Sequence, residues 1–501
     1  MNRKIGVILS YVLMSFEVLS TLLLTPFIIC SLGQAEYGVY KLSAAVNAYL
    51  FLLDLGVGNA IVRYVAKYRL TGEFEKNRRF FGISIIFYAA IGVFAAVIGV
   101  ILVYIFPSVF AKGLSLDEAV LGQKLLGVTI LNSAITLATA PFVNILVAYE
   151  RFAASRSISI AQIIIRMLLT FIALKIGTGA FGIVIVNFLM TIICRLVIIW
   201  YTFLSIKLYP MFKGIEKAFI KEIIAYSSLI FIQMIATQVN STVDQILIGS
   251  LVVSSSAILA IYGIGTQLVQ YFQSIGSAFT GVLMPGVVKM VEEKAPVKVL
   301  TDEMIRIGRF ILIVLCIVWA CFLMNGRDFI YLWVGKDNEE AYYVSIILMT
   351  AHMFILVESI GNYILWARNE HKEQAILKMI VVLVNILLTI ILIKWDALLG
   401  ATIGTFISLL IGDIGIMNYI FKRKLKINLC YYYKGLMKGI LPVTLITVVA
   451  GLFMRYIPIN GWIGFCLKNI GMVLVYVALL LVFGMNMHEK KTIKNIINVI
   501  K

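Results

Sequence analysis

Long apolar runs dominate this sequence and leave few residues for anything else. Of its 501 residues, 61% are hydrophobic and 14% are charged, whereas soluble proteins carry about 25% charge. A membrane-spanning helix needs about 20 apolar residues. Hydropathy predicts fourteen such spans near 5–30, 39–61, 80–105, 121–148, 158–176, 180–206, 223–250, 256–285, 308–332, 342–366, 376–394, 399–421, 436–457 and 461–485. The runs are continuously apolar, so we predict helices rather than alternating barrel strands, and hence an all-α polytopic membrane protein.

The loops between the runs are short and basic, and they predict the topology. The formal net charge is +18, which in a soluble protein would suggest a nucleic-acid partner. Here about 32 Lys and Arg fall in segments assigned to the cytoplasm and about 9 in segments assigned outside. We therefore predict a multi-pass membrane protein with both termini in the cytoplasm and with the lipid bilayer, not nucleic acid, as its partner.

No pattern typical of an enzyme is visible. The sequence has no P-loop and no His or Cys cluster at metal-ligand spacing, so we expect no metal, no cofactor and no use of ATP by this chain. Six scattered cysteines are predicted to be small core residues rather than disulfides. No predicted outer loop exceeds about 15 residues, which leaves no room for a catalytic domain outside, and we assign no catalytic residue.

The junction between the first two spans resembles the junction between spans seven and eight. In each, a Ser-Leu pair follows the first span and an aromatic residue opens the second, at 28–43 and at 247–265. Six helices intervene, so two six-helix halves would have the same orientation in the membrane. The predicted organisation is two pseudo-symmetric lobes, 1–206 and 207–421, followed by two further transmembrane helices and a cytoplasmic tail, 422–501.

Polar side chains recur at helical spacing within several predicted spans. Such a stripe marks a face turned toward protein or water, because polar groups are costly against lipid. The predicted cavity-lining residues are Asn47 in span 2, Gln233, Thr237 and Asn240 in span 7, and Gln267, Gln270 and Ser274 in span 8. A polar cleft between two helical bundles would explain why corresponding helices carry them. Hydrogen bonding between helices without a cavity is the alternative.

Ionisable residues inside spans cost about 2.5–3.5 kcal/mol each when central, so each needs a partner or water. Arg166 and Arg195 are candidates for binding a phosphate-bearing head group, with structural ion pairs as the alternative. Arg63 is a third candidate, at the predicted cytoplasmic surface, where topology alone would also place a cation. Candidates for coupling to a proton or sodium ion, or for partnering other groups in helix interfaces, are Glu17, Asp54, Asp244 and Glu358.

Three short motifs carry a family resemblance. The stretches L-G-Q-A-E-Y-G-V-Y (32–40), L-D-L-G-V-G-N-A-I-V-R (53–63) and V-D-Q-I-L-I-G (243–249) resemble those of Wzx-type polysaccharide flippases. These belong to the multidrug/oligosaccharidyl-lipid/polysaccharide exporter superfamily. The resemblance implies that Asp54, Arg63 and Asp244 occupy positions of the family's motifs and are functional candidates. One departure is Gln245, where the family commonly has a basic residue.

The resemblance implies two lobes around a central cavity that work by alternating access. The cargo would be an undecaprenyl-diphosphate-linked oligosaccharide, moved from the inner to the outer leaflet of the bacterial cytoplasmic (inner) membrane for O-antigen, capsule or exopolysaccharide synthesis. A polysaccharide polymerase and a chain-length regulator are the implied protein partners. Part of the family couples transport to an ion gradient, so a proton or sodium ion is the implied coupling ion.

Other functions remain open at this point. A peptidoglycan-precursor (lipid II type) flippase and a multidrug/cation antiporter share the superfamily. A membrane-embedded glycosyltransferase or polymerase resembles the chain in hydropathy alone. The sign of the cavity charge separates the transporters: a diphosphate carrier needs arginine or lysine, and a cation antiporter needs carboxylates without a cationic partner.

Overall fold

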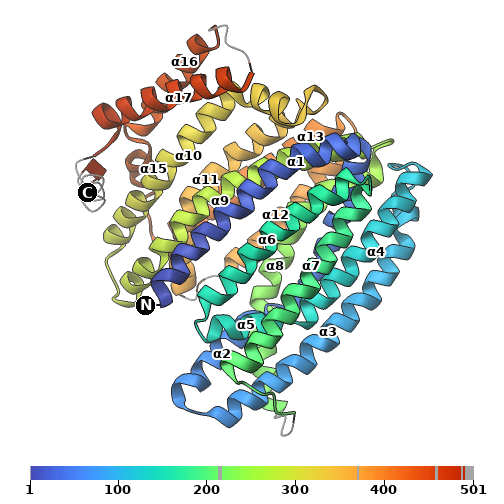
Figure 1. Ribbon diagram of the computed structural model, residues 1–501. Helices are drawn as coiled ribbons and strands as arrows, with labels where there is room; N and C mark the ends of the chain where they lie inside the picture. The colour runs from blue at the N-terminus through green and yellow to red at the C-terminus, as the bar shows by residue number, and fades with distance from the viewer. Residues whose placement is uncertain are drawn as a thin grey trace. The chain divides into compact units, whose positions relative to one another are not determined.

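The computed structural model describes residues 2–212, 217–368, 370, 372–456, 461–486 and 489–490. Helices make up the fold, and no β-strand occurs among these residues (Figure 1). The chain divides into two compact units, Met1–Gly263 and Ile264–Lys501. The division falls within helix α9, while the predicted lobe boundaries at 206 and 421 remain a prediction.

The first unit contains α1 (Asn2–Ala48), a short 3-10 helix η1 (Tyr49–Asp54), α2 (Val57–Thr71), α3 (Phe74–Val109), α4 (Leu116–Ala138), α5 (Ala140–Ala148), α6 (Phe152–Lys175), α7 (Gly179–Tyr201), the π-helical turn η2 (Thr202–Ile206), α8 (Lys217–Leu251) and the start of α9 (Ser256–Glu292). The second contains the rest of α9, α10 (Val297–Val334), η3 (Lys336–Asn338), α11 (Ala341–Ala367), α12 (Lys372–Leu392), α13 (Ala397–Leu409), η4 (Leu410–Ile416), α14 (Met417–Ile420), η5 (Phe421–Leu425), α15 (Leu429–Met437), α16 (Ile440–Met454), α17 (Gly461–Leu479) and η6 (Leu480–Gly484).

The all-α membrane class predicted from hydropathy is confirmed. Among the described residues, ten helical segments are long and apolar enough to cross a membrane, or eleven when the bent pair α15–α16 counts as one span. The first of these segments, Val12–Thr71, covers both of the first two predicted spans. The number fourteen therefore stays a prediction.

The junction expected between the first two spans is a sharp break at Gly33 rather than a long loop. Gly33 has φ 73° and ψ 171°, a non-helical conformation that glycine adopts without steric cost, so two helical segments of α1 meet there. The chain breaks again at Leu55 and Gly56, which both have positive φ. The predicted second span, 39–61, is thus divided between the end of α1, η1 and α2.

Two other predicted spans are also broken. The run 121–148 forms α4 and α5, with Pro141 in the first turn of α5, where its missing N–H group is tolerated. The run 436–457 starts in the last residues of α15 and continues as α16, which is bent by 43° from α15. Hydropathy does not show such breaks because both halves are apolar.

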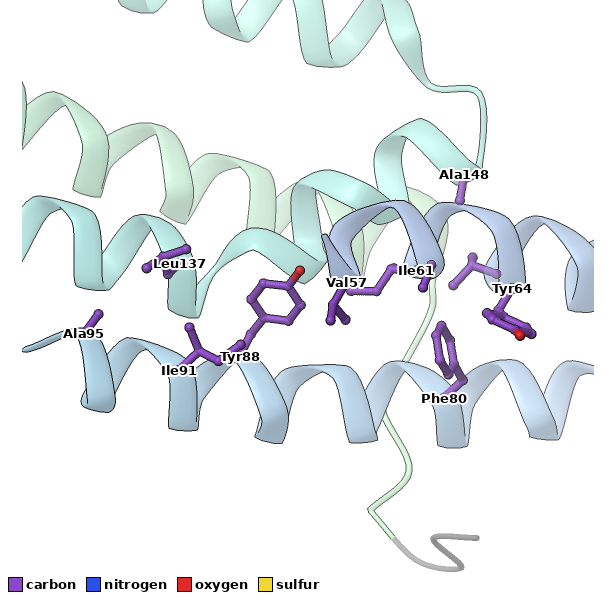
Figure 2. Packing of buried hydrophobic residues seen from close by; sticks show 11 residues of the cluster. Val57, Ile61, Tyr64, Phe80, Tyr88, Ile91, Ala95, Leu137 and Ala148 are labelled. Carbon is purple, nitrogen blue, oxygen red and sulfur yellow. The ribbon is translucent and has the colours of Figure 1, made fainter. Parts of the chain in front are cut away.

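The core of the first unit is formed where α2 lies against α3 and α5. Val57, Ile61, Tyr64, Phe80 and Tyr88 are all at most 6% exposed and pack in one layer between these helices (Figure 2). Tyr64 stacks at an angle on Phe80, with ring centroids 5.7 Å apart. The layer holds α2 in place and positions the chain break that precedes it.

A buried arginine joins the ends of several helices in the second unit. Arg309 of α10 and Glu489 are 3% and 1% exposed, and the Arg309 Nε lies 2.5 Å from the Glu489 Oε1. The guanidinium also donates to backbone carbonyls at the ends of α15 and η6, namely Gly435 at 3.0 Å, Lys438 at 2.7 Å and Gly484 at 2.8 Å. Hydropathy gave no signal of this contact, because it treats Arg309 as the edge of a span.

The cysteines divide into two groups. Cys194 and Cys316 are buried and Cys321 is half-buried, as expected for small core residues. Cys30, Cys430 and Cys466 are exposed, so the prediction of a core position was wrong for these three. All six are free thiols.

Candidate functional site

Asp54 lies at the end of η1, where the chain breaks before α2. The Tyr88 hydroxyl of α3 donates to its Oδ1 at 2.5 Å, and the Tyr88 ring packs beside Val57 (Figure 2). Tyr88 is its one hydrogen-bond partner among the described residues. Arg63, two turns further along α2, is exposed, with its guanidinium 6.0 Å from the centre of the Tyr64 ring. The structure thus ties Asp54 into a helix interface and leaves Arg63 on a surface.

Asp244 has a similar arrangement on α8. It is 4% exposed, and the Tyr262 hydroxyl of α9 donates to its Oδ2 at 2.5 Å. Gln245, which stands where the resembling family commonly has a basic residue, is also buried. Each of the two motif aspartates therefore accepts a hydrogen bond from a tyrosine on a neighbouring helix. This is the interface role that the sequence left open beside ion coupling.

We expect Tyr88→Phe to destabilise the first unit by about 1.5–3 kcal/mol, the range for a hydrogen bond to a charged group. The change removes the hydroxyl and leaves the packed ring in place. Thermal unfolding of the purified protein in detergent would measure it. Tyr104→Phe is the matched control, because Tyr104 lies on the same helix and is 81% exposed. Equal stability of the two variants would contradict the inferred role of the Asp54 contact.

A pocket of about 350 Å³ with a mixed polar and apolar lining lies between η1 and α8 in the first unit. It is lined by Phe51 and Leu52 of η1 and by Gln233, Met234, Thr237 and Gln238 of α8. Two of the residues predicted to line a cavity, Gln233 and Thr237, are among them, and Asn240 lies one turn further on, half-buried. Gln238 was missed, because it is one position off the stripe that the sequence suggested.

The other polar residues predicted to line a cavity lie elsewhere. Asn47 of α1 accepts a hydrogen bond from Ser133 of α4 at 3.0 Å, so it joins two helices. In the second unit, the buried Gln267 donates to the Tyr271 hydroxyl of its own helix at 2.7 Å. Gln270 is exposed, and Ser274 donates to its backbone carbonyl at 2.8 Å. These residues do not gather in one described pocket.

Arg166 and Arg195 lie on α6 and α7, which pack against each other and against α1. Arg166 continues the inward face of α6, which carries the buried Ile163, Thr170 and Leu174. Both arginines lie within electrostatic range of the Cys194 thiol, and Arg166 also within range of the Tyr40 hydroxyl. Both are half-buried, and neither has a carboxylate within ion-pair distance among the residues that the structure describes.

Lys41 of α1 is a third cation inside the first unit, and sequence reasoning missed it. Its ammonium lies 5.2 Å from the centre of the Tyr37 ring, and its aliphatic stem packs against Gly263. A lysine within an apolar run, one residue beyond the first resembling motif, was the signal that could have found it. Helices α1, α6 and α7 therefore each bring a cation into the interior of this unit.

Glu358 of α11 lies in a buried polar cluster of the second unit. It is 2% exposed, and its Oε1 accepts hydrogen bonds from Asn418 at 3.0 Å and from the Tyr433 hydroxyl. Three buried oxygens here, the Glu358 Oε2, the Asn362 Oδ1 and the Asn418 Oδ1, have no hydrogen-bond partner among the described residues. Buried polar atoms are normally satisfied, so these three oxygens are acceptors in the cluster that a proton or a cation would satisfy.

Glu17 differs from Glu358 in its surroundings. Its side chain is exposed on α1, and Ser20 and Thr21 bond only to its backbone carbonyl, at 3.0 and 2.7 Å. The four candidate carboxylates are therefore distributed over different environments. Asp54 and Asp244 each bond to a tyrosine, Glu358 has an oxygen without a described partner, and Glu17 has no described side-chain contact.

Residues of the first resembling motif have structural roles that the sequence did not reveal. Glu36 accepts a hydrogen bond from the Ala180 N–H at 2.6 Å and so caps α7, where a negative charge complements the helix dipole. Gly38 lets α1 approach α9 closely, because a Cβ atom at this position would lie 1.8 Å from the Ser256 carbonyl oxygen. Both residues fix how the middle of α1 packs against α7 and the start of α9.

Comparison with solved structures identifies the fold. The Lipid II flippase MurJ, in an inward closed conformation, matches with a TM-score of 0.71 and 18% identity over 95% of this chain and 98% of that one. An inward-facing multidrug resistance MATE family transporter of the MOP superfamily matches with a TM-score of 0.60 and 17% identity, over 81% of this chain and 95% of that one. At such identities the similarity establishes the fold alone.

The fold is thus that of a multi-pass membrane protein, and solved flippases and transporters share it. A third similar structure is a MOP superfamily transporter from Pyrococcus furiosus, with a TM-score of 0.54 and 16% identity over 84% of this chain and 96% of that one. The chain itself belongs to the polysaccharide biosynthesis protein family, which it matches over residues 5–291. No protein of curated function matches the sequence.

Proposed function

We propose that this protein is a flippase that moves undecaprenyl-diphosphate-linked oligosaccharide repeat units from the inner to the outer leaflet of the bacterial cytoplasmic membrane. The observation that carries this proposal is the pair Arg166 and Arg195, half-buried inside the first unit without a described carboxylate partner. Guanidinium groups bind phosphate oxygens in bidentate geometry, so such a pair suits a diphosphate. Membership of the polysaccharide biosynthesis family supports the same cargo class.

The physical problem that a flippase solves is the charged head of its cargo. A diphosphate and its sugars cannot cross about 30 Å of hydrocarbon unaided, because each polar group would lose its hydrogen bonds to water. A protein interior with cations and amide side chains replaces those bonds while the prenyl chain stays in lipid. No bond is made or broken in this process, so the proposed role is transport and not catalysis.

Alternating access would deliver the glycan to the outer surface, where a polysaccharide polymerase and a chain-length regulator would act on it. The test is mass spectrometry of undecaprenyl-linked glycans in a deletion strain, with outer-surface accessibility measured in intact cells. We expect a complete lipid-linked repeat unit to accumulate on the cytoplasmic side. Unchanged lipid-linked glycans together with lost resistance to cationic compounds would instead identify a cation antiporter. Accumulated lipid II would identify a peptidoglycan-precursor flippase.

Glu358 is the strongest of the candidate coupling residues, because one of its oxygens is buried without a described partner. We expect Glu358→Gln to keep the two hydrogen bonds to the remaining oxygen and to abolish stimulation of transport by an ion gradient. The measurement is the appearance of lipid-linked glycan on the far side of vesicles with an imposed proton or sodium gradient.

Glu75→Gln is the control for this experiment, since Glu75 is 76% exposed and pairs with Arg79 on its own helix. We expect it to respond to the gradient as the unchanged protein does. If Glu358→Gln kept its full response to both gradients, the proposed coupling role would fail, whereas the flippase proposal would stand.

A further inference from the structure

A second group of arginines lies at one end of the second unit, far along the sequence from Arg166 and Arg195. A pocket of about 190 Å³ is formed there by the last turns of α10, the first turn of α11 and the end of α16. Its lining consists of Leu323, Met324, Arg327, Tyr342, Tyr343 and Arg455. Two cations and two phenol rings thus share a space large enough for a phosphate group.

Arg327 is held by aromatic rings rather than by acids. The Arg327 guanidinium lies 4.9 Å from the Tyr343 ring centroid and 5.8 Å from that of Tyr342, and it donates to the Tyr343 hydroxyl. Arg327 and Arg455 both lie within electrostatic range of the Tyr342 hydroxyl. Tyr342 is itself fixed, because its hydroxyl donates to the Leu323 carbonyl at 2.9 Å.

No described carboxylate neutralises this pair. The nearest acidic residues in sequence are Asp328, Asp337, Glu339 and Glu340. Among the residues described, no ion pair joins Arg327 or Arg455 to a carboxylate. Asp328 follows Arg327 directly, and adjacent helical residues point in different directions. A guanidinium has five N–H donors, so most donors of both arginines are available to a ligand.

The usual excess of basic residues on the cytoplasmic side does not explain Arg327 and Arg455 either. The basic residues of this unit concentrate at the opposite ends of the helices, at Lys289, Lys294, Lys298 and Arg306 near the start of α10 and at 422–426 in η5. That end is the one predicted to face the cytoplasm. Arg327 and Arg455 therefore lie at the predicted outer surface, where cations are rare and where tyrosine side chains mark the level of the lipid head groups.

We propose that Arg327 and Arg455, with Tyr343, form a binding site for the phosphate group of a lipid in the outer leaflet. Arg327 and Arg455 both act on Tyr342, and two like charges in one pocket repel each other unless an anion joins them. A phosphate would bridge the two guanidinium groups through charge-assisted hydrogen bonds. The phosphate belongs either to an anionic phospholipid or to an isoprenoid diphosphate. If the lipid is an isoprenoid diphosphate, the inference rests on the proposed function. The site then receives the cargo after the cargo has crossed the membrane.

Native mass spectrometry of the purified full-length protein tests this proposal. One lipid is added at a time: phosphatidylglycerol, undecaprenyl diphosphate, or the zwitterionic phosphatidylcholine as a reference. We expect Arg327→Gln/Arg455→Gln to weaken binding of one or both anionic lipids by about tenfold or more, given the usual strength of charged hydrogen bonds. Arg327→Lys/Arg455→Lys keeps the charge but not the bidentate geometry, and should bind with intermediate affinity.

The matched control is Arg306→Gln/Arg423→Gln, which removes two exposed cations from the opposite end of the same unit. Selective loss of phosphatidylglycerol would assign the site to bulk phospholipid, and selective loss of undecaprenyl diphosphate would assign it to the cargo class. Unchanged binding of both lipids, or an equal loss in the control, would overturn the proposal. Because binding is measured without transport, failure of the flippase proposal leaves the phosphatidylglycerol result interpretable.

Discussion

Arg309→Gln will lower the stability of the second unit by about 3–5 kcal/mol, far more than the loss of an exposed cation would. The change leaves the Glu489 carboxylate buried without its cation, and it removes the donors that reach the carbonyls of Gly435, Lys438 and Gly484. Thermal unfolding in detergent, followed by intrinsic fluorescence, would measure the loss. We also expect increased proteolysis at the ends of α15 and η6.

Two further variants separate the causes of this effect. Arg309→Leu/Glu489→Leu removes both charges, and replacing a buried ion pair with apolar residues is often tolerated. Here it should recover only part of the stability, because the backbone carbonyls still lose their donor. Arg306→Gln, one turn earlier on the exposed face of α10, should change stability little, since surface ion pairs contribute about 0–1 kcal/mol. A similar loss for Arg306→Gln would contradict the inferred role of Arg309.

Arg166→Ala/Arg195→Ala will stop export of the lipid-linked glycan while the protein remains folded. Each arginine is expected to contribute about tenfold to binding of the diphosphate, the usual effect of a hydrogen bond to a charged group. A structural ion pair would behave differently, because its removal would leave a buried carboxylate and lower the unfolding temperature. The measurement is complementation of a deletion strain, with surface polysaccharide quantified beside the unfolding temperature of each variant.

Arg151→Ala provides the matched control for that experiment. Arg151 is exposed at the start of the same helix, α6, so its loss removes a charge without touching the interior. The double lysine variant should restore part of the export, since lysine keeps the charge but cannot bind in bidentate geometry. Normal export by the double alanine variant would show that these arginines do not bind the head group.

The sequence alone determined the all-α membrane class, because hydropathy shows directly whether a segment lies in lipid or in water. The expected run 342–366 became α11, and 256–285 became the larger part of α9. The motifs around Asp54 and Asp244 indicated the superfamily, and the family match agrees with it. Gln233 and Thr237 could be placed on one helical face, since spacing along a helix fixes which side chains share a face.

Only the tertiary structure decided what those residues contact. Asp54 and Glu358 look alike in sequence, as single carboxylates in apolar runs, yet one bonds to Tyr88 and the other keeps a buried oxygen without a described partner. Arg309 and Arg327 lie on the same helix, but the first is buried among carbonyls and the second opens a pocket. The partners in each case come from distant parts of the chain. Periodicity describes one helix at a time, so pairing between helices, and with it the role of each charge, depends on how the helices pack.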